Sequence, residues 1–238
     1  MKKNFGIFAA LFATILVAEA CDDGPIPRKE YTSTATGLTA KLTATITGTA
    51  NWPDYYQIAL AAFGSDSEYS LSQVQISADT TNAVFTLSNL DDDAETIELC
   101  VTNRLRKRIL TFQSADVADA VNDTVFLEAG TIDAAMFATI QTNIFNKQCT
   151  QCHGGSTSAA ANLYLTEGLS YDYLVNQPST QVDTGIRVIP GNADESILPK
   201  VINEGNILNF DYNHEYLITD DALLRLIDEW IDNNAHED

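Results

Sequence analysis

The strongest constraint on the fold is a hydrophobic pattern whose period changes near residue 130. From Leu38 onward, apolar and polar residues alternate, as in "LTAKLTATITGT", which is typical of half-buried β-strands. Five more segments of strand composition follow, separated by turn-like loops: "YYQIALAAF", "LSQVQIS", "AVFTLSNL", "TIELCVTN" and "RILTFQS". Six or seven short strands at this spacing predict an all-β immunoglobulin-like or transthyretin-like sandwich over residues 31–130.

Beyond residue 130 the apolar residues recur at helical spacing. The segment "TIDAAMFATIQTNIFNKQC" has Thr131 as its expected N-cap, and "TDDALLRLIDEWIDNNA" has Thr219 in the same role. The apolar faces that we expect from this spacing consist of Phe137, Ile140, Ile144 and Phe145 in the first segment, and Leu223, Leu226, Ile227, Trp230 and Ile231 in the second. We therefore predict a second, all-α domain over residues 131–238.

The first residues have the layout of a secretory signal peptide. Lys2 and Lys3 precede an apolar run, and small residues lead to Ala20 and Cys21 in "MKKNFGIFAALFATILVAEAC". The order around Cys21 resembles a bacterial lipobox, so we expect cleavage after residue 20, acylation of Cys21 and a polar tether over residues 21–30. The alternative is an ordinary signal peptide that leaves Cys21 as a spare thiol.

This leader predicts a lipoprotein of the bacterial cell envelope, anchored by lipid in the outer membrane on its periplasmic or surface face. The composition agrees with an exported, soluble body: 33 Asp and Glu stand against 13 Lys and Arg, a formal net charge of −20. Such a surface repels nucleic acid and favours cationic partners, so nucleic-acid binding is excluded as a function.

The motif that carries chemistry is "NKQCTQCHGG", residues 146–155, in which Cys149, Cys152 and His153 form a Cys-x-x-Cys-His sequence. A redox dithiol needs a strand-to-helix junction, and the motif follows a predicted helix instead. Structural zinc needs four ligands, which adjacent Cys152 and His153 supply poorly. A c-type haem uses all three residues: two thiols bond the porphyrin edge and the imidazole reaches the iron.

With this motif, the C-terminal half resembles the single-haem, class I-like cytochrome c domains of bacterial envelope proteins, in particular the planctomycete-type domain. The matching pieces are "IFNKQCTQCHGG", "NLYLTEGLSYDYLVNQPS", "RVIPGNADESILPKV" and "LITDDALLRLIDEWIDNNA". The resemblance implies a cytochrome c-like fold over residues 131–238 and one covalent haem c. It also implies thioether bonds to Cys149 and Cys152, with His153 as axial iron ligand.

The chain lacks the methionine that this family usually presents before the last helix, where "ILNFDYNHEYLIT" stands instead. We expect His214 to be the second axial ligand, with an open or water-capped sixth position as the alternative. Arg187 is expected to pair with a haem propionate, because a guanidinium matches a carboxylate fork. A solvated arginine is the alternative.

Three functions compete on this basis. The first is an electron carrier, not an enzyme, that exchanges electrons with a redox partner protein through the haem. The second is a haem protein that senses small ligands at an open sixth position. In the third, the β-sandwich binds a polymer or protein at the cell surface and the haem is accessory.

Overall fold

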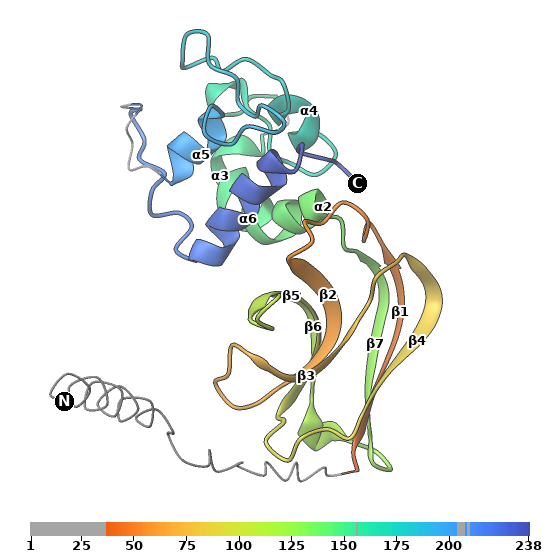
Figure 1. The fold of residues 1–238 in the computed structure, drawn as a ribbon. Helices are drawn as coiled ribbons and strands as arrows, with labels where there is room; N and C mark the ends of the chain where they lie inside the picture. Colours follow the sequence, from red (N-terminus) through yellow and green to blue (C-terminus); the bar gives the residue numbers. More distant parts are fainter. Residues whose placement is uncertain (1–36, 156, 204–207, 209) are drawn as a thin grey trace, which may run out of the picture. The chain divides into compact units, whose positions relative to one another are not determined.

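Seven strands build two sheets in the computed structural model, which describes residues 37–155, 157–203, 208 and 210–238. The strands are β1 (Thr39–Thr47), β2 (Tyr56–Phe63), β3 (Ser70–Gln75), β4 (Thr80–Ser88), β5 (Thr96–Asn103), β6 (Arg108–Asp116) and β7 (Thr124–Asp133). One sheet has the order β4-β1-β7 and the other β3-β2-β5-β6 (Figure 1). The predicted β-sandwich is therefore present, within residues 39–133.

Strand β1 shows why the alternating pattern produces this arrangement. Ala40, Leu42, Ala44 and Ile46 are at most 2 % exposed, whereas the residues between them are half-buried or exposed. Because successive side chains in a strand point to opposite faces, this single alternation decides which face of the sheet is buried. The predicted inner face of this segment is confirmed.

Strand β7 begins where no strand was predicted and runs into the segment that was expected to be helical. It pairs in parallel with β1 from Thr124 to Asp133, so Thr131 lies opposite Thr45 in the sheet. Thr131 is thus not a helix N-cap. The inter-strand hydrogen bonds to β1 outweigh a weak local capping preference. The turn that follows is closed by Asp133, whose carboxylate accepts a hydrogen bond of 3.0 Å from the Ala135 amide.

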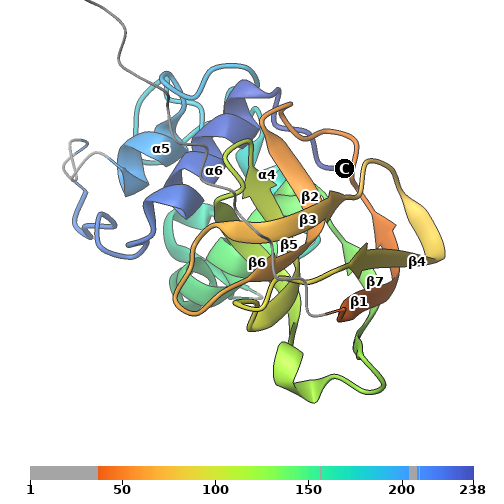
Figure 2. The same cartoon turned by 60° about the horizontal axis from the view of Figure 1, so that its bottom comes forward.

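The remainder of the chain consists of short helical elements joined by irregular segments. They are the 3₁₀ turn η1 (Val117–Asp119), α2 (Met136–Ile140), the π-helical segment η2 (Gln141–Cys149), α3 (Thr150–His153), the 3₁₀ turn η3 (Ala160–Asn162), α4 (Ser170–Leu174), α5 (Ile197–Ile202) and α6 (Asp221–Asp232). Figures 1 and 2 both show α5 beside α6. The last helix begins one residue later than predicted, with the Asp220 side chain accepting from the Ala222 amide at 2.8 Å.

The prediction of a distinct all-α cytochrome c-like domain over residues 131–238 is wrong. Among the described helices of that region, α6, at 12 residues, is the only one longer than the nine-residue η2. Most of the described chain between residues 154 and 196 is irregular. Glycines, prolines and left-handed residues such as Asn176 and Thr184 interrupt that stretch. The helical periodicity identified buried faces correctly but could not supply an independent helical core.

The buried side chains of the helices instead join the sandwich in one continuous apolar cluster. It includes Leu42 and Leu60 from the strands together with Ile140 and Trp230 from the helices. The expected helix faces are confirmed, because Phe137, Ile140, Ile144, Phe145, Leu226, Ile227, Trp230 and Ile231 are all buried and Leu223 is half-buried. Residues Thr34–Asp238 accordingly form a single compact unit.

Polar contacts reinforce this junction between strands and helices. The Tyr56 hydroxyl on β2 donates to the Glu229 carboxylate on α6. The Trp52 indole N–H donates to the Ala134 carbonyl at 2.8 Å, and the Trp52 and Tyr56 rings meet edge to face. Burial, together with the Glu229 carboxylate, raises the pKa of Tyr56, so its hydroxyl keeps its proton throughout the physiological range.

We expect the Tyr56→Phe substitution to lower the free energy of unfolding by about 1–2 kcal/mol, because it removes the Tyr56 hydrogen bond from the half-buried Glu229 carboxylate. Chemical denaturation followed by tryptophan fluorescence would measure this loss. Tyr69→Phe is the matched control, since Tyr69 is 50 % exposed and its substitution should change little. Equal stability of the two variants would show that the Tyr56 contact does not stabilise the junction.

Asp228 on α6 predicts a pH-dependent stability. Burial raises its pKa from 3.8 to about 6; Asp232 and Glu229 add to this effect, while the Asn203 amide, 3.1 Å from each carboxylate oxygen, opposes it. Because the folded-state pKa is the higher one, the stabilising effect of the neutral form is complete below about pH 4. It is lost as the pH rises through 6.

Asp228→Asn should therefore stabilise the protein by about 1 kcal/mol at pH 7.5, after allowance for solvent screening, and give no gain at pH 3.5. Thermal unfolding at the two pH values measures the difference, with the exposed Asp54→Asn as control. A gain of the same size at both pH values would contradict the assigned titration.

Candidate functional site

The Cys-x-x-Cys-His motif lies where the π-helical segment η2 passes into α3. Cys149 ends η2, and Cys152 and His153 form the last turn of α3. Side chains three residues apart lie on one side of a helix, so both thiols face the same region. Both are free thiols, Cys149 half-buried and Cys152 exposed. The wide turns of a π-helix are rare and often occur at functional sites.

The two thiols differ in their burial, which changes the acidity of Cys149. Burial, with a smaller effect from neighbouring Cys152, raises the pKa of the Cys149 thiol to about 11. Cys149 also packs against the shared apolar core. The third free cysteine of the described residues, Cys100, is fully buried on β5, as expected of a small apolar residue packed in a strand.

His153 is held by backbone carbonyls. Its Nδ1 atom lies 3.0 Å from the carbonyl oxygen of Ala160 and 3.1 Å from that of Leu163. Because both partners only accept hydrogen bonds, Nδ1 must carry the proton of the neutral ring, and the lone pair is left on Nε2. A metal-binding histidine is usually prepared in this way, with its other ring nitrogen donating to a carbonyl or carboxylate.

His214 faces His153 although the two residues are far apart in the sequence. The ring centroids are 6.3 Å apart and the ring planes make an angle of 28°. The Tyr212 ring meets His214 edge to face, with centroids 4.9 Å apart. The structure thus brings together the two histidines that the sequence singled out as axial ligands.

Burial, followed by the nearby His153 ring, lowers the pKa of His214, while the backbone of Tyr212 opposes this shift. Within the part of the chain that the structure describes, the buried Nδ1 of His214 has no hydrogen-bond partner of ordinary geometry. The lowered pKa keeps the ring neutral at neutral pH, which is the form that binds metals.

Arg187 is buried, with 8 % exposure, and its guanidinium faces backbone carbonyls. One terminal nitrogen donates to Tyr173 at 2.7 Å, and the other to Ala161 at 3.1 Å and Asn162 at 3.2 Å. Burial lowers the pKa of Arg187 from its ordinary value. The predicted propionate contact stays a prediction, since these bonds leave part of the guanidinium's donor capacity unused.

Cys21, the predicted lipid attachment point, lies outside the described residues, as do the signal peptide over residues 1–20 and the tether over residues 21–30. Within the described ranges, no group of three or more His, Cys, Asp or Glu side chains is placed to hold a metal ion. His153 and His214 each carry an imidazole, a side chain that can bind a metal through a ring nitrogen.

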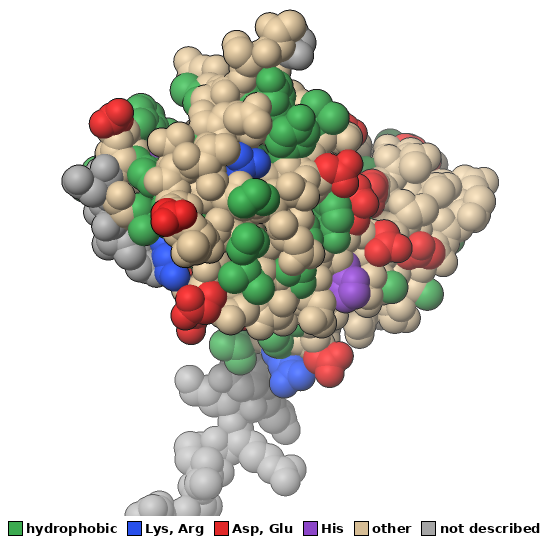
Figure 3. Space-filling model, turned by 90° about the horizontal axis from the view of Figure 1, so that it is seen from above, with side chains coloured by type: hydrophobic (Ala, Val, Ile, Leu, Met, Phe, Trp, Pro, Cys, Tyr) green, Lys and Arg blue, Asp and Glu red, His purple; other side chains and the backbone are tan. Residues whose placement is uncertain are grey.

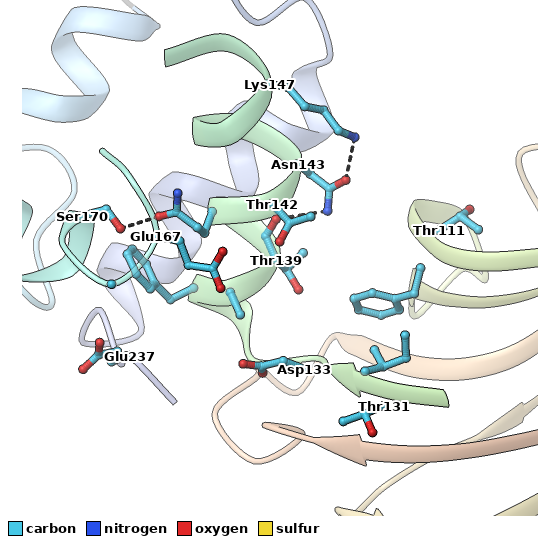
Figure 4. A pocket seen from close by; sticks show the side chains of 16 residues that line it. Thr111, Thr131, Asp133, Thr139, Thr142, Asn143, Lys147, Glu167, Ser170 and Glu237 are labelled. Atoms are coloured by element: carbon cyan, nitrogen blue, oxygen red, sulfur yellow. Dashed lines mark hydrogen bonds between the residues drawn. The ribbon is translucent and has the colours of Figure 1, made fainter. Parts of the chain in front are cut away.

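A cleft between the sandwich and the helices is separate from this site. It has a volume of about 580 Å³ and lies between β6 and β7 on one side and α2 and η2 on the other (Figure 4). Asp133, Glu167 and Glu237 lie around it, and the Lys147 ammonium donates to Asn143 at 2.9 Å. The lining residues do not include Cys149, Cys152, His153, Arg187 or His214.

Sequence reasoning missed the loop that orients His153. Its acceptors are main-chain carbonyls of Ala160 and Leu163, and the Leu165 amide also donates to the His153 carbonyl at 2.8 Å. Because every residue has a main-chain carbonyl, no residue type in "SAAANLYL", residues 158–165, indicates that this loop accepts hydrogen bonds from His153.

Comparison of the chain with protein-family models, with curated proteins and with solved structures found no match in any of the three.

The difference in burial predicts different reactivities for the two thiols of the haem-free chain. At pH 8 only about one Cys149 in a thousand carries the reactive thiolate, given its raised pKa. Iodoacetamide should therefore modify exposed Cys152 at least about tenfold faster than Cys149, as measured by peptide mass spectrometry. Buried Cys100 serves as the internal control for unfolding. Equal rates at Cys149 and Cys152 would contradict the burial of Cys149.

Proposed function

We propose that this protein transfers electrons by means of one covalently attached haem c. Cys149 and Cys152 would hold the porphyrin through thioether bonds, and His153 and His214 would be the axial ligands. The observation that supports this proposal best is the apposition of the two imidazole rings, with centroids 6.3 Å apart.

This spacing suits two imidazoles that share one metal ion. A bond from a metal to an imidazole nitrogen is about 2 Å long, so two such bonds in line, with the radius of each ring added, separate the centroids by about 6 Å. The observed distance of 6.3 Å between the His153 and His214 centroids is close to this value.

The surrounding residues prepare both rings for this role. The carbonyls of Ala160 and Leu163 hold the proton of His153 on Nδ1, and burial favours the neutral form of His214. A haem bound here supplies one-electron oxidation and reduction, at a lower potential than a His/Met pair of similar burial would give.

The position of His214 also bears on the sensing alternative. A haem-based sensor needs an open sixth position for its ligand, whereas the His214 ring, with its centroid 6.3 Å from that of His153, would fill that position in the proposed site. This supports electron transfer over small-ligand sensing.

For the cellular context we propose a lipoprotein of the bacterial envelope, anchored in the outer membrane by an acyl group on Cys21, that exchanges electrons with a redox partner protein. The support is the sequence of the leader, in which small residues precede Cys21 as in a lipobox. The part of the chain that the structure describes has no helix with the length and apolarity to cross a bilayer.

The charge of the surface supports a partner with a basic docking face. Figure 3 shows a face on which the charged side chains are mainly acidic, in keeping with the net charge of −20. Opposite charges on two proteins steer their encounter and raise the association rate. The same surface argues against nucleic acid as a partner.

Carbon monoxide tests the proposed ligand pair. The protein, produced in a host that attaches haem c, should show the absorption of thioether-linked haem and take up carbon monoxide slowly, because His214 must first leave. His214→Ala should bind carbon monoxide rapidly, at least about tenfold faster. His236→Ala is the matched control, since His236 is exposed in the C-terminal tail.

Two outcomes would contradict separate parts of the proposal. A colourless mature protein would refute haem attachment altogether. Rapid carbon monoxide uptake by the unchanged protein would refute ligation by His214 while leaving the attachment to Cys149 and Cys152 intact.

A further inference from the structure

The backbone carbonyls of a four-residue loop, Ala160–Leu163, accept hydrogen bonds from two side chains, those of His153 and Arg187. The outer carbonyls, of Ala160 and Leu163, accept from His153 Nδ1. The inner carbonyls, of Ala161 and Asn162, accept from the guanidinium of Arg187. The loop is thus held on one side by Arg187 and holds His153 on the other.

We propose that Arg187 is a positioning residue for His153, acting through the loop 160–163. This inference rests on the proposed function, because the orientation of His153 matters for chemistry only if its Nε2 binds a metal. It differs from the predicted propionate contact, since the partners of Arg187 here are backbone groups of the protein itself.

The backbone of the loop explains why it needs support from outside. Ala161 and Asn162 both have left-handed conformations, with φ of 53° and 49°. Such conformations are unfavourable for alanine in particular and persist only where surrounding contacts impose them. The bonds from Arg187 to both residues are such contacts, and the Thr180 hydroxyl adds a third bond, 2.8 Å long, to the Ala161 carbonyl.

The bonds of Arg187 depend on the shape of its side chain as well as on its charge. The planar guanidinium reaches three carbonyls at once, those of Tyr173, Ala161 and Asn162. The ion pairs of the described residues are Lys107–Glu68 and Arg108–Glu98, so Arg187 is not neutralised by a carboxylate there. A lysine has no such planar fork and cannot reproduce this arrangement.

The loop in turn determines the rotation and the protonation of the His153 ring. With two carbonyl acceptors at Nδ1, the ring keeps its proton there and its Nε2 lone pair is directed away from the loop. The Leu165 amide, which donates to the His153 carbonyl, ties the end of the same segment to α3. Loss of the Arg187 bonds to the inner carbonyls should therefore also weaken the contacts of the outer carbonyls with His153 Nδ1.

The test compares Arg187→Lys and Arg187→Gln with the unchanged chain, all in the haem-free, full mature form. Two signals report on the loop: hydrogen exchange of the Leu165 amide and the ¹⁵N chemical shifts of the His153 ring. Both variants should accelerate Leu165 exchange about tenfold and convert the single Nδ1–H tautomer into a mixture. Arg225→Gln, which removes the same charge from an exposed position on α6, should change neither signal.

If only the positive charge of Arg187 matters, Arg187→Lys should show the same Leu165 exchange rate and the same His153 ring shifts as the unchanged chain. That result would overturn the proposal. An unaltered Leu165 amide in Arg187→Gln would overturn it as well. Exchange of the Leu60 and Leu99 amides, in β2 and β5, shows whether each variant is folded.

Should both Arg187 variants fail to fold, Thr180→Val decides the question, because Thr180 is exposed and contacts the same Ala161 carbonyl. It should accelerate Leu165 exchange about threefold, and an unchanged rate would again overturn the proposal. The absorption spectrum of the haem-loaded protein reports on the proposed function separately. A colourless protein with a loosened loop in the variants would refute the haem and leave the loop coupling standing.

Discussion

The structure depends on an apolar core that the β-sandwich and the C-terminal helices share. Trp230 on α6 lies against Phe137 on α2, with ring centroids 4.9 Å apart, and Phe137 also contacts Tyr171 on α4. These side chains belong to the same cluster as the inner faces of the sheets or pack against it. Because each helix is short, it is stabilised mainly by burying one face in this cluster. The helices could not form a domain without the strands.

This shared core explains how the candidate site is assembled. The parallel pairing of β7 with β1 fixes where the chain leaves the sandwich, and α2 and η2 lead from there to Cys149. Helix α6 packs on the same core, and His214 comes shortly before its first residue. Two histidines separated by most of the C-terminal region are therefore brought face to face by packing that involves neither of them.

Much of the local structure could be predicted from residue patterns. The alternation in β1 and the helical spacing of α6 both identified their buried faces, because the geometry of a strand or helix converts sequence spacing directly into a face. The ends of elements were predicted less well. Thr131 has the residue type of an N-cap but lies in β7, since pairing with β1 continues past it. Local preferences of that size give way to tertiary hydrogen bonds.

In the candidate site, too, the residues could be predicted from the sequence, whereas their tertiary contacts could not. Cys149, Cys152 and His153 are recognisable because their spacing is specific, and His214 was noticed because the expected methionine is absent. The role of Arg187 was not foreseen, since its partners are the carbonyls of Tyr173, Ala161 and Asn162. Every residue has a carbonyl, and only the path of the chain decides which carbonyls converge on one guanidinium.

The sequence by itself determined most of the strands of the sandwich and the buried faces of the helices, because each follows from the spacing of neighbouring residues. Only the tertiary structure decided that strands and helices share one core, that His153 and His214 face each other, and that the loop 160–163 lies between His153 and Arg187. These features join residues that are distant along the chain, and their meeting depends on how the whole core packs.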